Sequence, residues 1–347
     1  MIFFAIFSMM VLLAGYICAK GIFLIFKLTW LSVLAMLLTI TVPLSIYIWM
    51  ADIVRCFGHI YCGFLLYFSI CCASILVAYK LKPKLKYRRF LKYSLPAVIA
   101  LLVLGYINAL HPRLREIRIP SDSNAKICFI SDMHVGSIST PTMLNRIANL
   151  INEANPDIVI LGGDTLDLNA TKKYRNEFIQ TFEQITKKFR TIAVIGNHEI
   201  YSGLRENVKL LQDAGIEVLL DRAISFEDFT IIGRLDRSIA QRNQISDLII
   251  TNGKKTIVVD HQPNDIPNIV KHNAFLYLAG HTHGGQVFPF NFVIDLMYSK
   301  TGALQKFKNS YVYISSGAGF WGPPFRIGSM PEVVLIRLEN CYTNQQK

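Results

Sequence analysis

Four long uncharged stretches in the first third of the chain limit how it can fold more than any other feature. A helix needs about 20 mostly apolar residues to cross the hydrocarbon core of a bilayer. A buried hairpin in a soluble protein would instead need polar faces, and only scattered Ser and Thr are present. The sequence therefore predicts an all-α transmembrane region of about four helices over residues 1–110. The stretches are Met1–Ala19, Leu28–Ala51, Cys56–Tyr79 and Tyr93–Leu110.

The orientation of this region follows from its basic residues. The connection between residues 80 and 92 carries seven Lys or Arg residues, whereas the preceding connection has only Arg55 beside Asp52. By the positive-inside rule the connection 80–92 is cytoplasmic, and Lys20 and Lys27 then lie on the same side. Residues after Leu110 are therefore expected to be extracytoplasmic, although a short basic cluster just past this point works against that orientation. The cluster is Arg113, Arg115 and Arg118.

The charge of the chain does not favour a nucleic-acid partner. Hydrophobic residues make up 52% of the sequence and charged residues 17%, and the formal net charge is +12. Residues 1–110 hold ten of the 36 basic residues and one of the 24 acidic residues, which leaves 26 and 23, or +3, for the rest. A charge of +3 is too small to form the basic surface that binding a nucleic-acid duplex requires. Phosphorylated small molecules or lipids, and membrane lipids themselves, are better candidates for partners.

A linker is expected between the membrane region and a second domain. Residues 111–125 contain two prolines and a polar Ser-Asp-Ser-Asn run, a composition typical of a segment with little regular structure. The second domain is then expected over residues 126–347. Two of the seven cysteines lie in it, Cys128 and Cys341, and neither has the spacing of a zinc knuckle or of a disulfide framework.

Apolar strands that end in polar residues recur through this second domain. Strands are predicted at 126–131, 158–161 and 191–195, with helices at 141–153 and 177–189 between them. This alternation is typical of an α/β fold with a parallel sheet, in which sites gather at the carboxyl ends of the strands. A further helix is expected at 204–214, and further strands at 217–220, 230–233, 256–260, 275–279, 311–315 and 332–338.

The residues that follow these strands are those that bind metal ions. The stretch Gly280–Gln286 reads Gly-His-Thr-His-Gly-Gly-Gln, and on an extended strand its two histidines, His281 and His283, would share one face. Each polar residue taken alone can be a helix cap or a structural histidine. Taken together they favour a metal site: Asp132, His134, Asp164, Asn197, His198, His261, His281 and His283.

This pattern resembles that of the calcineurin-like metallophosphoesterase superfamily. The blocks run in the order DxH, GD, GNH with an acid, a lone His and GHxH, over about residues 126–338. The resemblance implies a four-layer αββα sandwich. The matching blocks are Asp132-Met133-His134, Gly163-Asp164, Gly196-Asn197-His198-Glu199, His261 and Gly280-His281-Thr282-His283.

The resemblance also implies roles for the matching residues. Two divalent metal ions are expected, drawn from Mn, Fe, Zn and Mg because the donors are oxygen and imidazole without thiolate. A pair of ions roughly 3.5–4 Å apart turns a bridging water into hydroxide and stabilises an in-line displacement. His198 is the expected catalytic residue, which stabilises transition-state charge or protonates the leaving oxygen. One ion is implied to bind Asp132, His134 and His283, the other to bind Asn197, His261 and His281, and Asp164 to bridge them.

Several other residues remain open between a functional and a structural interpretation. Asp167 and Glu199 either orient the ligands or are solvated loop residues, and Asp265 departs from the family spacing after His261. Three arginines either bind a substrate phosphate or lie on the surface. Four aromatic residues form either an apolar lip or part of the core. The arginines are Arg234, Arg237 and Arg242, and the aromatic residues are Phe288, Phe290, Trp321 and Phe325.

The sequence therefore predicts a membrane-anchored, dinuclear-metal-dependent phosphoesterase that hydrolyses a phosphate mono- or diester. Its position at a membrane favours a lipid or lipid-linked substrate. Two alternatives stay open. The first is an anchored phosphodiesterase or nucleotidase that acts on soluble substrates, and the second is a metal-bound scaffold without catalysis.

Overall fold

The protein forms two compact units in a computed structural model that describes residues 13–17, 19–20, 23, 52–82, 87–136, 141–249 and 253–339. One unit comprises residues 1–107 together with 322–325, and the other comprises residues 108–321 and 326–347. The division after residue 107 lies close to the boundary at 110 that the sequence predicts.

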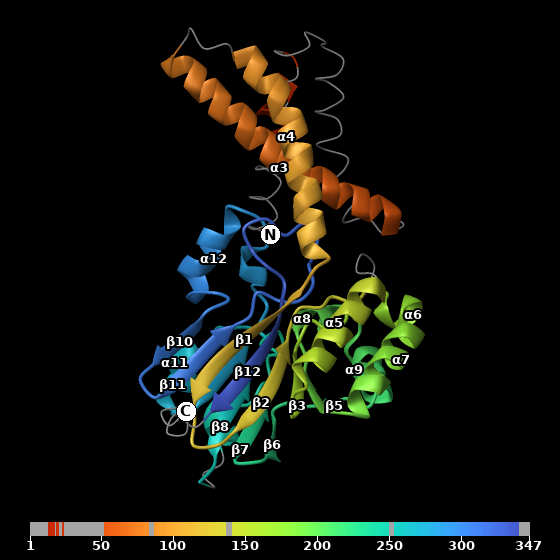
Figure 1. The fold of residues 1–347 in the computed structure, drawn as a ribbon, viewed down its shortest axis with the longest axis vertical. Coiled ribbons are helices and arrows are strands. Elements are labelled where there is room, and N and C mark those ends of the chain that lie inside the picture. The colour runs from red at the N-terminus through yellow and green to blue at the C-terminus, as the bar shows by residue number, and fades with distance from the viewer. Residues whose placement is uncertain are drawn as a thin grey trace. The chain divides into compact units, whose positions relative to one another are not determined.

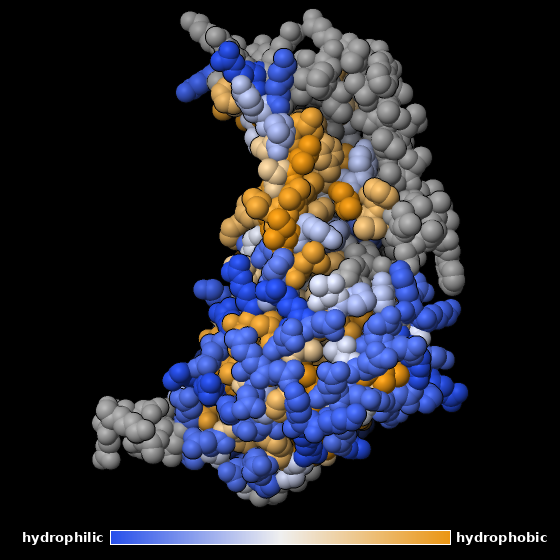
Figure 2. Space-filling view, turned by 45° about the vertical axis from the view of Figure 1, so that its right-hand side comes forward, coloured by the Kyte–Doolittle hydropathy of each residue, from blue (hydrophilic) through white to orange (hydrophobic). Residues whose placement is uncertain are grey.

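The first unit contains two long apolar helices among the described residues. They are α3 (Asp52–Leu81) and α4 (Tyr87–Ala109). Within them, Cys56–Ile75 and Lys92–Ala109 are long and apolar enough to cross a membrane, a test of length and composition that a buried core helix also passes. Most of the predicted stretch Met1–Ala19 and all of Leu28–Ala51 lie outside the described residues, so the prediction of four helices is not confirmed. On the face in Figure 2, hydrophobic residues gather along the helical unit and hydrophilic residues cover most of the α/β unit.

The second unit is built on two mixed six-stranded sheets. In the first sheet, β2, β3, β4 and β5 are parallel neighbours, and β12 pairs antiparallel with β2. Its strand order is β1-β12-β2-β3-β4-β5. The strands are β1 (Arg113–Pro120), β2 (Ala125–Ile130), β3 (Ile158–Gly162), β4 (Arg190–Val194), β5 (Glu217–Val218) and β12 (Glu332–Glu339).

The second sheet has a parallel centre and antiparallel edges. Strands β11, β9, β8 and β7 are parallel neighbours, while β10 and β6 pair antiparallel at the two ends. Its strand order is β10-β11-β9-β8-β7-β6. The strands are β6 (Arg222–Phe226), β7 (Phe229–Gly233), β8 (Lys255–Val259), β9 (Leu276–Ala279), β10 (Leu304–Phe307) and β11 (Ser310–Ile314).

Helices cover the outer faces of both sheets, which gives the α/β unit its layers. The helices α5 (Pro141–Ala154), α7 (Arg175–Thr186) and α9 (Leu204–Asp213) pack on the first sheet and lie together on one side in Figure 1. The short helices α10 (Ile245–Leu248) and α11 (Ile266–Lys271) pack on the second sheet. The remaining elements are α6 (Ala170–Lys173), α8 (Asn197–Tyr201), the 3₁₀ turn η1 (His283–Gly285) and α12 (Phe290–Tyr298).

A continuous apolar core lies between the two sheets. Ile127 and Ile160 from the first sheet and Ile231 and Ile257 from the second are all fully buried in it. Each such side chain contributes roughly 1.5–3 kcal/mol relative to leaving it exposed. The helices follow the same logic, since α5 buries Leu144, Ile147 and Ile151 at helical spacing against the first sheet. This core fixes the strand ends on which the candidate site is built.

The predicted linker 111–125 is wrong in its main part. Residues 113–120 form the edge strand β1, which pairs in parallel with β12 from Arg113↔Glu332 to Pro120↔Glu339. Ile119 is buried and the flanking charged residues are exposed, so the segment has the alternation of a half-buried strand. Proline is tolerated at the end of an edge strand. The two prolines suggested a loop, although the period-two pattern between them indicates a strand.

Candidate metal centre

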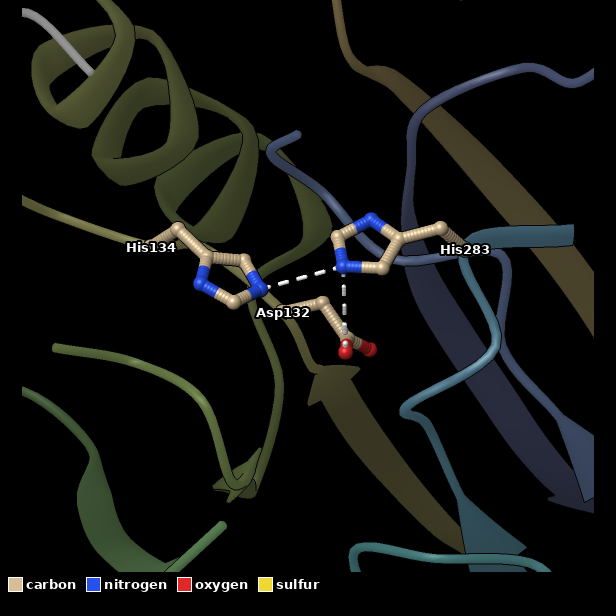
Figure 3. A group of neighbouring side chains, drawn as sticks. All are labelled: Asp132, His134 and His283. Atoms are coloured by element: carbon tan, nitrogen blue, oxygen red, sulfur yellow. Dashed lines mark hydrogen bonds and ion pairs between the residues drawn. The ribbon is translucent and has the colours of Figure 1, made fainter. Parts of the chain in front are cut away.

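The first group of candidate ligands comprises Asp132, His134 and His283 (Figure 3). All three side chains are buried, and their ligand atoms lie within 4.8 Å of one another. Nε2 of His134 is 3.0 Å from Nε2 of His283, which in turn is 3.6 Å from Oδ1 of Asp132. Two ring nitrogens and a carboxylate that converge on one point in this way have the arrangement of a ligand set.

The second group comprises Asp164, His261 and His281, which also lie within 4.8 Å of one another. Nε2 of His261 is 3.1 Å from Oδ2 of Asp164, but it makes no aligned hydrogen bond there. Nδ1 of His261 bonds the carbonyl of Gly162, which turns Nε2 toward the site. Asn197 begins α8 beside this group, and its Oδ1 is buried without a hydrogen-bond partner.

These unpartnered atoms are the test of whether a metal fits here. A buried polar atom without a hydrogen bond destabilises the folded state by about 1–3 kcal/mol, so such atoms are rare in native proteins. Two of them at one site indicate a common partner. Oδ1 of Asn197 carries lone pairs, and Nε2 of a neutral His261 carries one because Nδ1 holds the proton toward the carbonyl of Gly162, so a cation would satisfy both atoms. The oxygen and imidazole set therefore fits divalent ions.

Asp164, a member of the second group, also faces the first. Its Oδ2 is 3.7 Å from Nε2 of His134 in the first group and 3.1 Å from Nε2 of His261 in the second. Burial alone would raise the pKa of Asp164, but the imidazoles of His261 and His134 hold it below its usual value. The backbone N–H of His198 donates to the other oxygen, Oδ1, at 2.8 Å. Asp164 is thus an ionised carboxylate placed to face both groups.

The charges around the two GHxH histidines favour their neutral form. Burial, the Arg326 guanidinium and the His134 ring together hold the pKa of His283 well below its usual value. Burial and the neighbouring His261 lower the pKa of His281. A histidine must be neutral to bind a metal, so the site favours metal binding by both side chains.

The backbone at the strand ends is held in the left-handed region. Asp132, His134 and Asp164 have φ of 56°, 49° and 50°, and His281 and His283 have φ of 71° and 50°. Such conformations are rare outside glycine and gather at functional sites. The expectation that His281 and His283 share one face of an extended strand is therefore wrong. The chain turns at each of them and delivers the two rings to different groups.

Two glycines allow the loops to approach the carboxylates closely. A Cβ on Gly196 would lie 2.2 Å from Oδ1 of Asp164, and one on Gly280 would lie 2.5 Å from Oδ2 of Asp132. Heavy atoms do not approach that closely, so any side chain at either position would displace a ligand. This explains why glycine precedes the Asn197 and His281 blocks.

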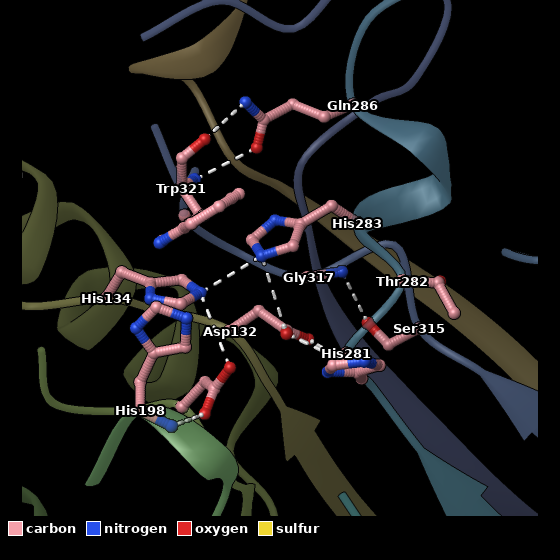
Figure 4. Close-up of polar contacts among 12 residues, drawn as sticks. Asp132, His134, His198, His281, Thr282, His283, Gln286, Ser315, Gly317 and Trp321 are labelled. Carbon is pink, nitrogen blue, oxygen red and sulfur yellow. Dashed lines mark hydrogen bonds and ion pairs between the residues drawn. The ribbon is translucent and has the colours of Figure 1, made fainter. Parts of the chain in front are cut away.

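Asp167 orients two histidines at once. Its Oδ2 is 3.2 Å from Nδ1 of His134, and its Oδ1 is 3.1 Å from Nδ1 of His198. His198 lies across from His134, with the ring planes nearly perpendicular (Figure 4). Burial by itself lowers the pKa of His198, but Asp167 and Asp164 raise it above its usual value. Asp167 is therefore a positioning residue and not a solvated loop residue.

Glu199 has a structural role. It is fully buried, and its carboxylate accepts the backbone N–H groups of Asp164, Leu166 and Gly196 at 3.0, 2.8 and 2.9 Å. Burial and the charge of Asp164 raise the pKa of Glu199 to about 7, against the amide donors, which favour the charged form. Glu199 joins the β3 and β4 end loops into one unit.

The three arginines do not bind the site as a group. Arg234 is buried and lies 3.4 Å from Asp221 and from Asp265, while Arg242 pairs with Asp260 at 2.5 Å. Arg237 is exposed. Asp265, which departs from the family spacing, thus belongs to an ion-pair network behind His261, and Arg234 and Arg242 act on protein carboxylates instead of a substrate phosphate.

Arg326 and Gln286 belong to the site although no motif marks them. Arg326 is buried and donates to the carbonyl of His283 at 2.6 Å, and its Nη2 is 3.2 Å from Nδ1 of the same ring. Gln286 exchanges two hydrogen bonds of 2.8 and 2.9 Å with the backbone of Trp321 (Figure 4). Only the adjacency of Gln286 to the GHxH block could have indicated its role.

The predicted aromatic residues divide between surface and core. Trp321 is 54% exposed, and its ring centroid lies 5.6 Å from that of His198 at the open side of the site. Phe288 and Phe290 are also exposed. Phe325 is buried and belongs to the helical unit. The surface interpretation therefore applies to three of the four residues.

Comparison with known proteins decides the family. The family model described as calcineurin-like phosphoesterase matches residues 125–285. An uncharacterized metallophosphoesterase of Helicobacter pylori (strain J99) is 30% identical over 268 residues, which cover 72% of this chain and 72% of the relative. The chain belongs to the calcineurin-like metallophosphoesterase family.

Other metallophosphoesterases extend this similarity. An uncharacterized metallophosphoesterase of Aquifex aeolicus is 30% identical over 232 residues, 64% of this chain and 88% of the relative. A transmembrane protein with metallophosphoesterase domain from Danio rerio is 28% identical over 267 residues, 70% of this chain and 61% of the relative. Some relatives of this metallophosphoesterase are therefore transmembrane proteins.

Proposed function

We propose that the protein hydrolyses a phosphate mono- or diester at a centre of two divalent metal ions, while its N-terminal helices anchor it in a membrane. One observation carries the chemistry: Oδ2 of Asp164 lies 3.7 Å from Nε2 of His134 and 3.1 Å from Nε2 of His261. A carboxylate shared by two imidazole groups is the bridge that a pair of ions needs.

The ligand roles follow from the two groups. Asp132, His134 and His283 would hold one ion, and Asn197, His261 and His281 would hold the other. Mn, Fe, Zn and Mg all suit such oxygen and nitrogen donors. When bound, the ions supply Lewis-acid activation of the phosphate and of the attacking water.

His198 acts on the substrate side of this centre. Asp167 holds Nδ1 of His198 at 3.1 Å, so Nε2 is the nitrogen that meets the ester. The carboxylates nearby raise the pKa of His198, which favours the protonated form of the ring. The proton can stabilise charge on the phosphate or pass to the leaving oxygen.

The anchor supports a substrate at the membrane surface. The apolar segments Cys56–Ile75 and Lys92–Ala109 have the length of membrane spans, and the exposed side chain of Trp321 lies beside His198. A lipid or lipid-linked phosphate fits both features. Membrane lipids are then the second partner, and the small net charge after residue 110 gives no reason for a nucleic acid.

The test is a panel of metals and substrates on the purified full chain. After chelation, Mn²⁺, Zn²⁺ or Mg²⁺ should restore turnover, measured on p-nitrophenyl phosphate, on its bis-ester and on lipid phosphates in mixed micelles. His198→Ala should lower turnover by about 10²–10⁴-fold with metal content unchanged. Full activity of both His198→Ala and Asp164→Asn with metals supplied would falsify the proposal.

A further inference from the structure

The outward face of α12 is apolar, the reverse of a surface helix in a soluble domain. Along this helix Phe292 is 61% exposed, Leu296 is 87% exposed and Met297 is 63% exposed, and Val293 lies beside them at 48%. These positions fall on one face at helical spacing. No residue of α12 is buried, so the helix keeps its apolar side chains in solvent.

The polar side chains of α12, Asn291 and Asp295, lie toward its own domain, and Asp295 makes a hydrogen bond there. Oδ1 of Asp295 accepts the backbone N–H of Thr301 at 3.2 Å, and Asn291 lies against Gly328. A Cβ on Gly285 would lie only 2.3 Å from the backbone nitrogen of Asn291, so the start of the helix is fixed against the metal-binding turn. The apolar face is therefore exposed because the start of α12 is fixed in this position, and not because the helix frays.

The loop 326–330 makes hydrogen bonds both to the segment that leads into α12 and to the end of α4. The backbone N–H of Phe288 donates to the carbonyl of Ile327 at 2.7 Å. Ser329 lies in the same loop, and its carbonyl accepts a hydrogen bond of 3.1 Å from Nδ2 of Asn108, near the end of α4. Ala109, the last residue of α4, is fully buried in the core of the α/β unit. Ile327 and Ser329 are two residues apart, which is about 7 Å of chain at most.

We propose that α12 lies in the membrane interface, with its outward face against lipid, and so holds the metal centre at the bilayer surface. The inference rests on the proposed membrane anchoring through α4. If α4 spans the bilayer, its end at Ala109 marks the water boundary, and the loop 326–330, which contacts Asn108, also holds Phe288, two residues before α12 begins. An interfacial helix of this kind buries its apolar face about 5–10 Å into the headgroup boundary.

Two further features favour lipid over a second protein. Met330, in the loop shared by α4 and α12, is 49% exposed, so the apolar surface continues toward the end of α4. Lys300, just past the helix, is exposed and can reach lipid phosphates while its stem lies along apolar surface. The metal-binding turn η1 ends five residues before α12 begins, so a lipid headgroup would meet the site without leaving the bilayer surface.

Photo-crosslinking in lipid tests this directly. The photoreactive residue benzoylphenylalanine is placed at Leu296 or Val293 of the full chain, which is reconstituted in phosphatidylcholine nanodiscs and irradiated. Mass spectrometry then identifies the adducts. The matched control is the same residue at Leu220, an exposed leucine after β5. At least about tenfold more lipid adduct is expected at 293 and 296 than at 220, given the depth of an interfacial helix.

The possible outcomes are distinct. Equal lipid adduct at all three positions, or a cross-linked dimer at 296 in place of lipid, overturns the inference. Circular dichroism and thermal unfolding establish that each variant is folded, and the readout does not depend on catalysis. A chain that hydrolyses phosphate esters and floats with vesicles but gives no α12 adduct rejects this inference alone, whereas a chain that does not float rejects the membrane anchor as well.

Discussion

At the scale of single residues, the site depends on carboxylates that each serve two partners. Asp164 faces both histidine groups, and Asp167 contacts one ring of the candidate metal ligands and the ring of His198. A shared carboxylate fixes the relative position of its two partners, because moving one disturbs the other. The relative position of the rings of His134 and His198 is thus set by one side chain, that of Asp167.

Asp167→Asn tests whether Asp167 orients the rings of His134 and His198. An amide can keep only one of the two carboxylate contacts, so His198 or His134 loses its orientation. We expect kcat/KM to fall by about 10–100-fold, as is usual for partners of ligating histidines. Asp228→Asn, in the exposed turn before β7, is the control and should leave kcat/KM unchanged. An Asp167→Asn enzyme with the wild-type pH profile and kcat/KM would contradict the role.

At the scale of elements, the site is a set of loops at strand ends. The loops after β2, β3, β4, β8 and β9 carry all seven candidate ligands. Four of these strands were predictable because apolar runs stop at polar residues, and the fifth because it leads into the GHxH block. Parallel strands bring such ends to one edge of a sheet. The order of the strands within each sheet was not predicted. The packing of one sheet on the other was implied by the resemblance alone.

Other elements escaped prediction for physical reasons. The edge strand β1 was hidden by its prolines, and α12 was hidden because its apolar residues face outward instead of repeating toward a core. Arg326 had no motif, since its contacts are mainly to carbonyls that the fold brings together from distant segments. Local pattern predicts local structure, while these features depend on tertiary packing.

Gly196→Ala tests how tightly the β4 loop approaches the bridging carboxylate. The φ of Gly196 is −99°, so alanine meets no backbone strain, but its Cβ would lie 2.2 Å from Oδ1 of Asp164. We expect metal content and turnover to fall at least about tenfold, because the displaced carboxylate is the shared ligand of the proposed centre. Gly253→Ala, which has open space around it but a φ of +79°, is the control for glycine replacement far from the site, and its backbone strain should leave metal content unchanged. Normal metal content in Gly196→Ala would show that the loop can move.

At the scale of the whole molecule, charge and hydrophobicity are divided between two parts of the chain. Residues 1–110 carry a charge of +9 from ten basic residues and one acid, and they include the apolar helices. The α/β part is nearly neutral and carries the site. This division supports the proposed membrane anchor on the α/β domain that carries the site.

The orientation of the chain is testable by fusion. The basic connection between residues 80 and 92 predicts that this segment is cytoplasmic and that the catalytic domain is extracytoplasmic. A reporter that functions only in the cytoplasm, fused after Lys347, should therefore be inactive, and one fused after Lys82 should be active. Activity of the fusion after Lys347 would reverse the predicted orientation.

Metal content of the purified full chain tests the central claim of a dinuclear centre most directly. Elemental analysis should give about two divalent ions per wild-type chain and about one in both His281→Ala and His283→Ala, because each histidine serves a different ion. Asp164→Asn should weaken both sites. The two histidine variants should also differ in which ion remains, as seen by spectroscopy of Co²⁺-substituted protein. A wild-type chain that binds a single ion would contradict the dinuclear centre. Identical spectra of the two histidine variants would contradict the assignment of His281 and His283 to different ions.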